Sequence, residues 1–295
     1  MVATEVTAPV AWEDIIPRWK KYAPPARPSE EDVARIRLRV DEFLRTSART
    51  DQVEALVLGS TPELRTMLAG MSQLRVTILD CVLPMMQAMT TFVDAEPLHE
   101  VWIRGDWLTA PLPGHYFDLV VSDLVLGNLC PDDQLELMSR VRAVLKPAGR
   151  WVSRIDCVDE FSVFENLDTL LEHYSRRVEL SPADVCELRS VAGLRHWDPA
   201  SGFLSYAALG EAMGRYWDGE RFVHPDGRIS RLLTRLREVT LPFGRPYWLS
   251  HKWQLDAVLG QHFRIVDERR DDSPYAYPGR GYYVYDLAPR ASSWA

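Results

Sequence analysis

Short apolar runs and amphipathic stretches alternate along the middle of the chain. Residues 55–58, 74–79 and 117–121 are mainly apolar runs of strand length, and such runs, when turn residues bound them, are typical of buried strands. The stretches between them place apolar side chains at helical spacing. Strands that alternate with helices in this way predict an α/β fold around a mostly parallel sheet.

The turn after the first run is the best specified. Gly59 ends the strand, and Thr61-Pro62-Glu63 opens a helix with a good N-cap residue, a proline suited to the first turn and an acid at the positive end of the helix dipole. The next strand ends on Asp80, which lies 80 − 59 = 21 residues after the glycine. A strand, a glycine turn, a helix and a second strand that ends in an acid form the nucleotide half-site of a doubly wound sheet, in which the acid binds the ribose hydroxyls.

The same turn also narrows the choice of ligand. It holds one glycine, Gly59, instead of the three glycines of a G-x-G-x-x-G turn. Three glycines let the backbone close on a pyrophosphate, so their absence argues against NAD and FAD. A ligand with a ribose but no phosphate remains compatible with the pattern.

Five segments, taken in order and spacing, resemble the motifs of the class I S-adenosylmethionine-dependent methyltransferases. They are residues 58–64, Asp80, residues 105–107, residues 117–123 and residues 145–150. The resemblance spans residues 52–157. It implies a Rossmann-like methyltransferase sheet, mostly parallel with an antiparallel C-terminal strand, with helices on both faces and a helical cap insert. Two strand-like runs near the C-terminus, residues 263–268 and 282–287, fit the hairpin that closes such a sheet.

The resemblance implies S-adenosylmethionine as the cofactor and suggests which residues contact it. Asp80 would bind the ribose hydroxyls, Asp106 would accept from the adenine amino group, and Trp107 would cover the adenine ring, although an ordinary turn with a loop tryptophan is the alternative for the last two. Cys81 and Met85 either line the adenine pocket or belong to the core. The full set of expected cofactor contacts in this part of the chain is Gly59, Ser60, Thr61, Asp80, Cys81, Met85, Asp106, Trp107, Ser122 and Asp123.

Three regions are expected from the pattern. Residues 1–50 form an N-terminal helical lid or cap, whose Trp19 and Tyr22 either close over the cofactor or dock on the core. The cofactor-binding domain comprises residues 51–157 and 251–295, and residues 158–250, too long for a simple crossover, form a helical substrate cap. Helices are expected within the insertion at residues 160–174, from 181 onwards, at 205–216 and at 230–239.

The sequence offers only weak candidates for catalysis. Asn128 follows the strand expected at residues 117–121, and it is expected either to hold an amine or a polar substrate group, or to form a turn. His173 and Tyr174 lie in a predicted helix of the insertion and are candidates for a base or an anchor, with a structural role as the alternative. No histidines have the spacing of metal ligands, so no metal is expected.

Composition limits the partners. The chain has 295 residues, 46% of them hydrophobic, and a formal net charge of −8, which disfavours nonspecific nucleic-acid binding and favours a small-molecule substrate. No run reaches the ~18 uncharged apolar residues of a membrane helix, and the N-terminus lacks a signal-peptide pattern. A cytoplasmic protein, monomer or homodimer, is expected. The four cysteines are scattered without the spacing of a metal site, so each is expected to be a buried free thiol.

The most favoured function is a methyltransferase that acts on a small molecule by in-line transfer from the sulfonium. A second hypothesis is an enzyme that transfers the aminocarboxypropyl group of the cofactor, or cyclises it to azetidine-2-carboxylate, with release of methylthioadenosine. A third is a non-catalytic cofactor-binding subunit, and a dehydrogenase is the fallback. No motif identifies the acceptor or a general base.

Overall fold

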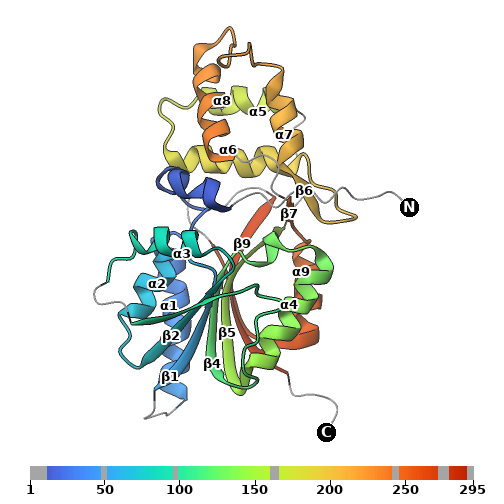
Figure 1. The fold of residues 1–295 in the computed structure, drawn as a ribbon. Coiled ribbons are helices and arrows are strands. Elements are labelled where there is room, and N and C mark those ends of the chain that lie inside the picture. The colour runs from blue at the N-terminus through green and yellow to red at the C-terminus, as the bar shows by residue number, and fades with distance from the viewer. Residues whose placement is uncertain are drawn as a thin grey trace.

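The computed structural model describes residues 12–47, 52–95, 99–159, 166–240, 246–271 and 279–290. Its centre is a seven-stranded sheet with the strand order β3-β2-β1-β4-β5-β9-β8 (Figure 1). The strands are β1 (Val53–Leu58), β2 (Leu74–Asp80), β3 (Glu100–Arg104), β4 (Phe117–Asp123), β5 (Leu145–Val158), β8 (Phe263–Arg270) and β9 (Arg280–Pro289).

Strands β1 to β5 are parallel, and β9 runs antiparallel to both of its neighbours. This confirms the Rossmann-like methyltransferase sheet with its C-terminal hairpin. The strand order turns back at β1, whose neighbours β2 and β4 lead in opposite directions across the sheet. In open α/β sheets, ligands bind at the carboxyl ends of the strands at such a switch point.

Helices cover both faces of the sheet because alternate residues of each buried strand point to opposite sides. Helices α1 (Glu30–Thr46), α2 (Pro62–Ala69) and α3 (Leu83–Thr90) share one apolar cluster with residues such as Val57 and Val121. Helices α4 (Pro131–Val144) and α9 (Lys252–His262) share another with residues such as Leu56 and Val120. The result is a three-layer sandwich (Figure 1).

The insertion forms a separate cap with its own core. It holds α5 (Leu167–Ser175), α6 (Pro182–Leu194), α7 (Tyr206–Gly214), α8 (Gly227–Thr240) and a small sheet of β6 (Phe203–Ser205) and β7 (Pro246–Trp248). Its helices pack through leucines, among them Leu188, Leu209 and Leu232. The cap lies beyond the carboxyl ends of the strands (Figure 1). Val158 pairs with His251, so the insertion leaves and rejoins the sheet at one point.

The expected helices of the insertion are present, with different bounds. Helix α5 begins at Leu167. The first part of the helix expected from residue 160, residues 160–165, lies outside the described residues. The pairing of β6 with β7 was not expected, because it joins two three-residue segments separated by α7 and α8.

The N-terminal region divides into two parts. The segment Trp12–Lys21 is the 3-10 helix η1, and Pro17 lies within it. Ile15 of η1 packs against Met85 and Met89 of α3. Helix α1, which Ser29 caps, packs on the sheet as one of its layers, so among the described residues only the part before α1 lies where a lid is expected.

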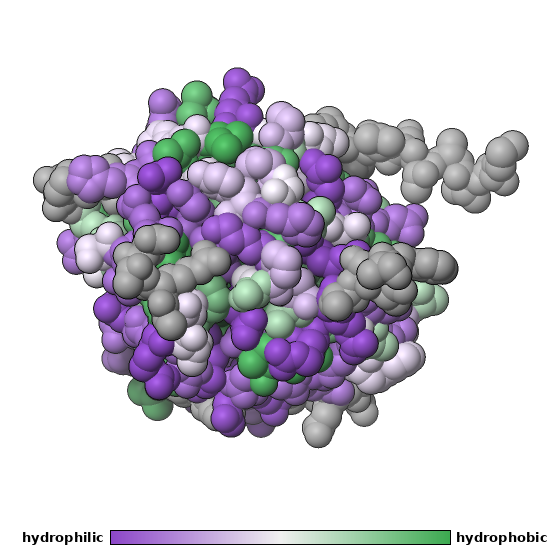
Figure 2. All heavy atoms as spheres, turned by 90° about the horizontal axis from the view of Figure 1, so that it is seen from below, coloured by the Kyte–Doolittle hydropathy of each residue, from purple (hydrophilic) through white to green (hydrophobic). Residues whose placement is uncertain are grey.

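Figure 2 views the end of the molecule opposite the cap. Hydrophilic residues dominate this face, and the hydrophobic ones are scattered between them. The visible apolar surface is therefore divided into small areas, as is usual for protein surfaces exposed to water.

Candidate active site

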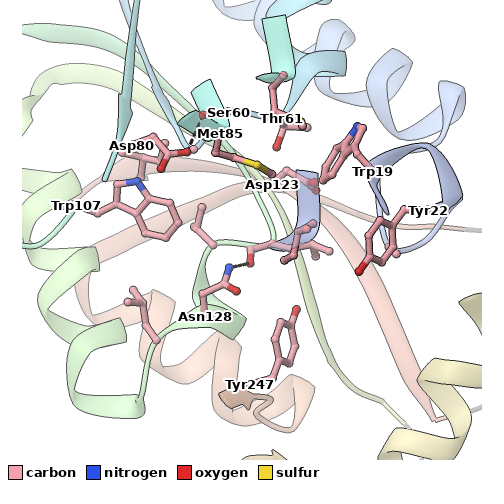
Figure 3. A pocket seen from close by; sticks show the side chains of 18 of the residues that line it. Trp19, Tyr22, Ser60, Thr61, Asp80, Met85, Trp107, Asp123, Asn128 and Tyr247 are labelled. Atoms are coloured by element: carbon pink, nitrogen blue, oxygen red, sulfur yellow. Dashed lines mark hydrogen bonds between the residues drawn. The ribbon is translucent and has the colours of Figure 1, made fainter. Parts of the chain in front are cut away.

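A cavity of about 310 Å³ lies at the carboxyl ends of the strands, between the sheet, η1 and the cap. Figure 3 shows Asp80 and Trp107 on one side of it and Trp19 and Tyr22 on the other. The structure brings most of the residues expected from the sequence to this cavity. They are Trp19, Tyr22, Gly59, Ser60, Thr61, Asp80, Cys81, Met85, Asp106, Trp107, Asp123 and Asn128.

The turn after β1 forms one wall. Gly59 has a φ of +89°, a conformation that residues with a Cβ rarely adopt. The indole ring of Trp107 lies beside it, at 3.6 Å from the place a Cβ would occupy. Thr61 stands at the N-cap of α2, but its side chain makes no capping hydrogen bond, unlike the expected cap. Thr61, the residue just before the first turn of α2, borders the cavity.

Asp80 lies at the end of β2 and is 8% exposed. One carboxylate oxygen accepts from Ser60 Oγ at 2.6 Å, and the other accepts from the Val82 amide at 2.9 Å. Burial raises the pKa of Asp80 above its ordinary value, although these hydrogen bonds oppose the shift. A carboxylate has about four acceptor sites, so two hydroxyls of a ribose fit the sites that Ser60 and Val82 leave.

Asp106 and Trp107 follow β3. The Asp106 carboxylate accepts from the Leu108 amide at 2.7 Å, and the side chain is otherwise exposed to the cavity mouth. The Trp107 indole N–H donates to the Leu79 carbonyl at 3.0 Å, which fixes the plane of the ring beside Gly59. A flat apolar ring next to a carboxylate suits a planar base with an amino group.

Asp123 ends β4 and belongs to a buried charge network. It accepts from Arg154 Nε at 2.6 Å, and Arg154 also pairs with Asp32 of α1 at 3.1 Å. Burial raises the pKa of Asp123 to about 6, against the opposing effect of Arg154. The network holds this carboxylate at the edge of the cavity, where a bound cationic group would stabilise its charged form.

Ser122 is the expected cofactor residue that does not reach the cavity. It is fully buried, pairs with Ser153 Oγ at 2.7 Å, and accepts from the Trp151 indole at 2.9 Å. Its neighbour Asp123 points to the cavity, and successive residues of a strand point to opposite sides. Ser122 therefore stabilises the sheet interior.

Of the three expected catalytic residues, only Asn128 borders the cavity. It ends the short 3-10 helix η2 (Leu126–Asn128), and its amide nitrogen donates to the Leu124 carbonyl at 2.9 Å. His173 and Tyr174 lie on α5, away from the cavity lining, and Tyr174 is buried in the cap core beneath Arg177. Tyr174 lies on the apolar face by which α5 packs into the cap core.

Several cavity residues escaped the sequence analysis. Tyr247 of β7 lies over Gly127, where a Cβ would be only 2.2 Å from the phenol ring, and its hydroxyl donates to Asp156 at 2.9 Å. Tyr247, Arg189 of α6, Tyr206 of α7, Arg280 and Tyr282 of β9 form the wall on the cap side. The aromatic loop around Tyr247 is a weak signal, but no local pattern joins residues from elements so far apart in sequence.

Within the described ranges, no group of three or more potential ligands could hold a metal ion. Over the same ranges, no helix combines the length and apolar character needed to cross a membrane.

Comparisons with solved structures show the fold. The structure is similar to the CcbJ methyltransferase of Streptomyces caelestis (16% identity, TM-score 0.54, covering 94% of this chain and 96% of that chain). It is also similar to a Rhodobacter sphaeroides protein provisionally described as a Zn-dependent alcohol dehydrogenase (14% identity, TM-score 0.55, covering 95% of this chain and 97% of that chain). A third similar structure is the PH0226 protein of Pyrococcus horikoshii OT3 (14% identity, TM-score 0.51, covering 92% of this chain and 98% of that chain). At these identities the likeness concerns the fold alone.

A sequence comparison with protein-family models identifies the family of the domain. No curated protein matches the chain significantly, but residues 30–149 match the model of a methyltransferase domain. This range includes the Gly59 turn, Asp80, Asp106 and Asp123. Residues 30–149 are therefore a methyltransferase domain of the class I S-adenosylmethionine-dependent family, and the cofactor of the chain is S-adenosylmethionine.

Proposed function

We propose that this methyltransferase acts on a small-molecule acceptor, which binds on the cap side of the cavity. The observation that carries the proposal is that one cavity joins the expected cofactor residues, such as Asp80, to cap residues such as Arg189 and Tyr206. A site enclosed by a sheet edge and a helical cap suits a small molecule better than a polymer.

S-adenosylmethionine supplies a sulfonium-bound methyl group, which needs little activation. Asp80 binds the ribose hydroxyls through charge-assisted hydrogen bonds. Asp106 and Trp107 hold the adenine, and Asp123 faces the cationic methionine arm beside the Gly59 turn. These contacts fix the direction from which a nucleophile must approach the methyl group.

The cap side of the cavity then positions the acceptor. Asn128 and Tyr247 lie close to each other at the boundary between the sheet and the cap (Figure 3). Trp19 and Tyr22 lie on the side opposite Asp80 and Trp107 (Figure 3). Alignment of the nucleophile with the C–S bond and exclusion of water provide the rate enhancement in this account.

The cap side also bears on the alternative reactions. Cyclisation of the aminocarboxypropyl group requires no second substrate, and therefore no second set of polar side chains. The extension of the cavity to Arg189, Tyr206 and Arg280 favours transfer to an acceptor.

The test is calorimetric titration of S-adenosylhomocysteine into the wild-type protein and into Asp80→Ala. We expect affinity to fall by roughly tenfold or more in the variant, because two ribose hydroxyls lose their partner. Asp41→Ala removes an exposed acid of α1 and serves as the control with unchanged affinity. Equal affinity in Asp80→Ala and wild type would contradict the proposed cofactor site.

A further inference from the structure

The two sides of the cavity differ in charge. The sheet side carries the carboxylates of Asp80, Asp106 and Asp123, and the cap side carries the guanidinium groups of Arg189 and Arg280. A ligand that fills the cavity therefore meets acceptors at one end and cationic donors at the other.

Arg280 already has a counterion within the protein. It forms an ion pair with Asp156, and the two side chains are only 4% and 1% exposed. Its Nη1 also donates to the Tyr206 hydroxyl at 3.3 Å. The charge of Arg280 is thus balanced without a ligand.

Arg189 has no such counterion among the residues that the structure describes. Its guanidinium carbon lies 4.4 Å from the centre of the Tyr206 ring, and no described carboxylate lies within ion-pair distance of it. Its Nε atom is buried and lacks a hydrogen-bond partner in the described part of the chain. Arg189 is half-buried. A cation partly withdrawn from water without a counterion is costly, and repulsion from Arg280, on the same side of the cavity, adds to the cost.

The properties of Tyr206 show the sign of the local field. Burial would raise the pKa of its hydroxyl, but Arg189 and Arg280 outweigh burial and bring the pKa below its ordinary value. The cap side therefore has an excess of positive charge, even with Asp156 present.

We propose that Arg189 is a ligand-binding residue that receives a carboxylate group of the small molecule in the cavity. The planar guanidinium fork matches a carboxylate in two parallel hydrogen bonds, and the stacking on Tyr206 holds that fork in place. The inference rests on the proposed function, since it assigns a charge to the molecule that binds there. The carboxylate belongs either to the acceptor or to the methionine arm of the cofactor, and the experiment below separates these two sources.

The first arm measures the thermal stability of the ligand-free protein. Arg189→Met removes an unpaired, half-buried charge, so we expect an equal or higher melting temperature. Arg177→Met is the matched control: Arg177 also stacks on a cap tyrosine, at 4.3 Å from the Tyr174 ring, but it pairs with Asp184 and Glu187 outside the cavity. We expect the control to melt at a lower temperature than wild type. A clear drop for Arg189→Met would indicate a structural arginine and overturn the proposal.

The second arm measures binding. The first two probes, S-adenosylhomocysteine and methylthioadenosine, which lacks the carboxylate, are titrated into the ligand-free protein. The third probe is a panel of aliphatic and aromatic monocarboxylates with their primary amides. The panel is added to protein that is already saturated with S-adenosylhomocysteine. If the acceptor carries the carboxylate, we expect wild type to prefer carboxylates over the matched amides by roughly tenfold. Arg189→Met loses this preference, and Arg189→Lys keeps part of it.

The remaining outcomes separate the sources and the proposals. If Arg189→Met binds S-adenosylhomocysteine less tightly but methylthioadenosine equally well, the bound carboxylate is that of the cofactor. If no probe distinguishes Arg189→Met from wild type, the inference is wrong. Failure of the proposed function looks different, because S-adenosylhomocysteine would then not bind to the wild-type protein.

Discussion

At the scale of single residues, Gly59 combines a left-handed backbone conformation with a place in the proposed cofactor site. A Cβ at its φ of +89° is strained, and the Trp107 ring lies beside it. We expect Gly59→Ala to lower the free energy of unfolding by about 1–2 kcal/mol and to weaken S-adenosylhomocysteine binding, as judged by urea unfolding and calorimetry. Gly214→Ala, at the end of α7 with open space around it, is the control and should be neutral or slightly stabilising. Equal effects of the two substitutions would contradict this account of the turn.

Asp123 makes stability depend on pH. Its pKa is about 6 in the folded protein and 3.8 ordinarily, so between these values the folded state holds a proton that the unfolded state has released. Stability therefore falls as pH rises through this window. Relative to Asp123→Asn, wild type should lose about 2 kcal/mol between pH 4 and pH 7.

Urea unfolding of both proteins at several pH values measures this difference. Asp286, whose pKa burial also raises to about 6, is present in both proteins and cancels in the comparison. A difference in stability that stays constant with pH would show that Asp123 does not titrate as described.

At the residue scale, the sequence indicated which residues lie together in the cavity where the evidence was local. Gly59 and Asp80 lie in one strand–turn–helix–strand unit, so spacing alone brings them together in the sequence. The network around Asp123 could not be predicted, because Arg154 and Asp32 come from a strand and a helix 122 residues apart. Ser122 illustrates the remaining limit, since the pattern marked the end of β4 without showing which of two adjacent side chains faces the cavity.

At the scale of elements, the sheet was predictable and the cap was predictable only in outline. Strands such as β1 and β4 are continuous apolar runs, and the hairpin of β8 and β9 has flanking turn residues. The cap helices have apolar faces as well, but those faces pack on each other, so Tyr174 of α5 lies in the cap core and not in the cavity lining. The residues that do face the cavity, such as Arg189 and Tyr247, show no periodic signal.

The helix η1 provides a test at the element scale. Its Trp19 lines the cavity on the side opposite Trp107 (Figure 3). We expect Trp19→Ala to weaken S-adenosylhomocysteine binding by roughly tenfold, through loss of buried apolar contact, with little change in the melting temperature. Trp253→Ala, which removes a 68% exposed tryptophan of α9, is the matched control in calorimetry and should bind like wild type. Unchanged affinity in Trp19→Ala would mean that η1 contributes no wall to the cofactor site.

At the scale of the whole molecule, the cavity depends on two units that are built separately. The sheet has its own apolar clusters on both faces, and the cap has another. The insertion begins and ends beside the Val158–His251 bridge, so its attachment lies at the carboxyl ends of the strands. In the proposed function, the sheet holds the cofactor and the cap determines which molecule receives the methyl group.

The most direct measurement is the identification by mass spectrometry of what the purified protein makes from S-adenosylmethionine, alone and with the carboxylate panel. We predict that the cofactor alone stays intact, and that S-adenosylhomocysteine and a methylated acceptor appear together when a suitable carboxylate is present. At cofactor concentrations below saturation, Asp80→Ala should form both products more slowly than wild type, because it binds the cofactor less tightly. Methylthioadenosine released from S-adenosylmethionine alone would contradict methyl transfer and indicate a reaction of the aminocarboxypropyl group.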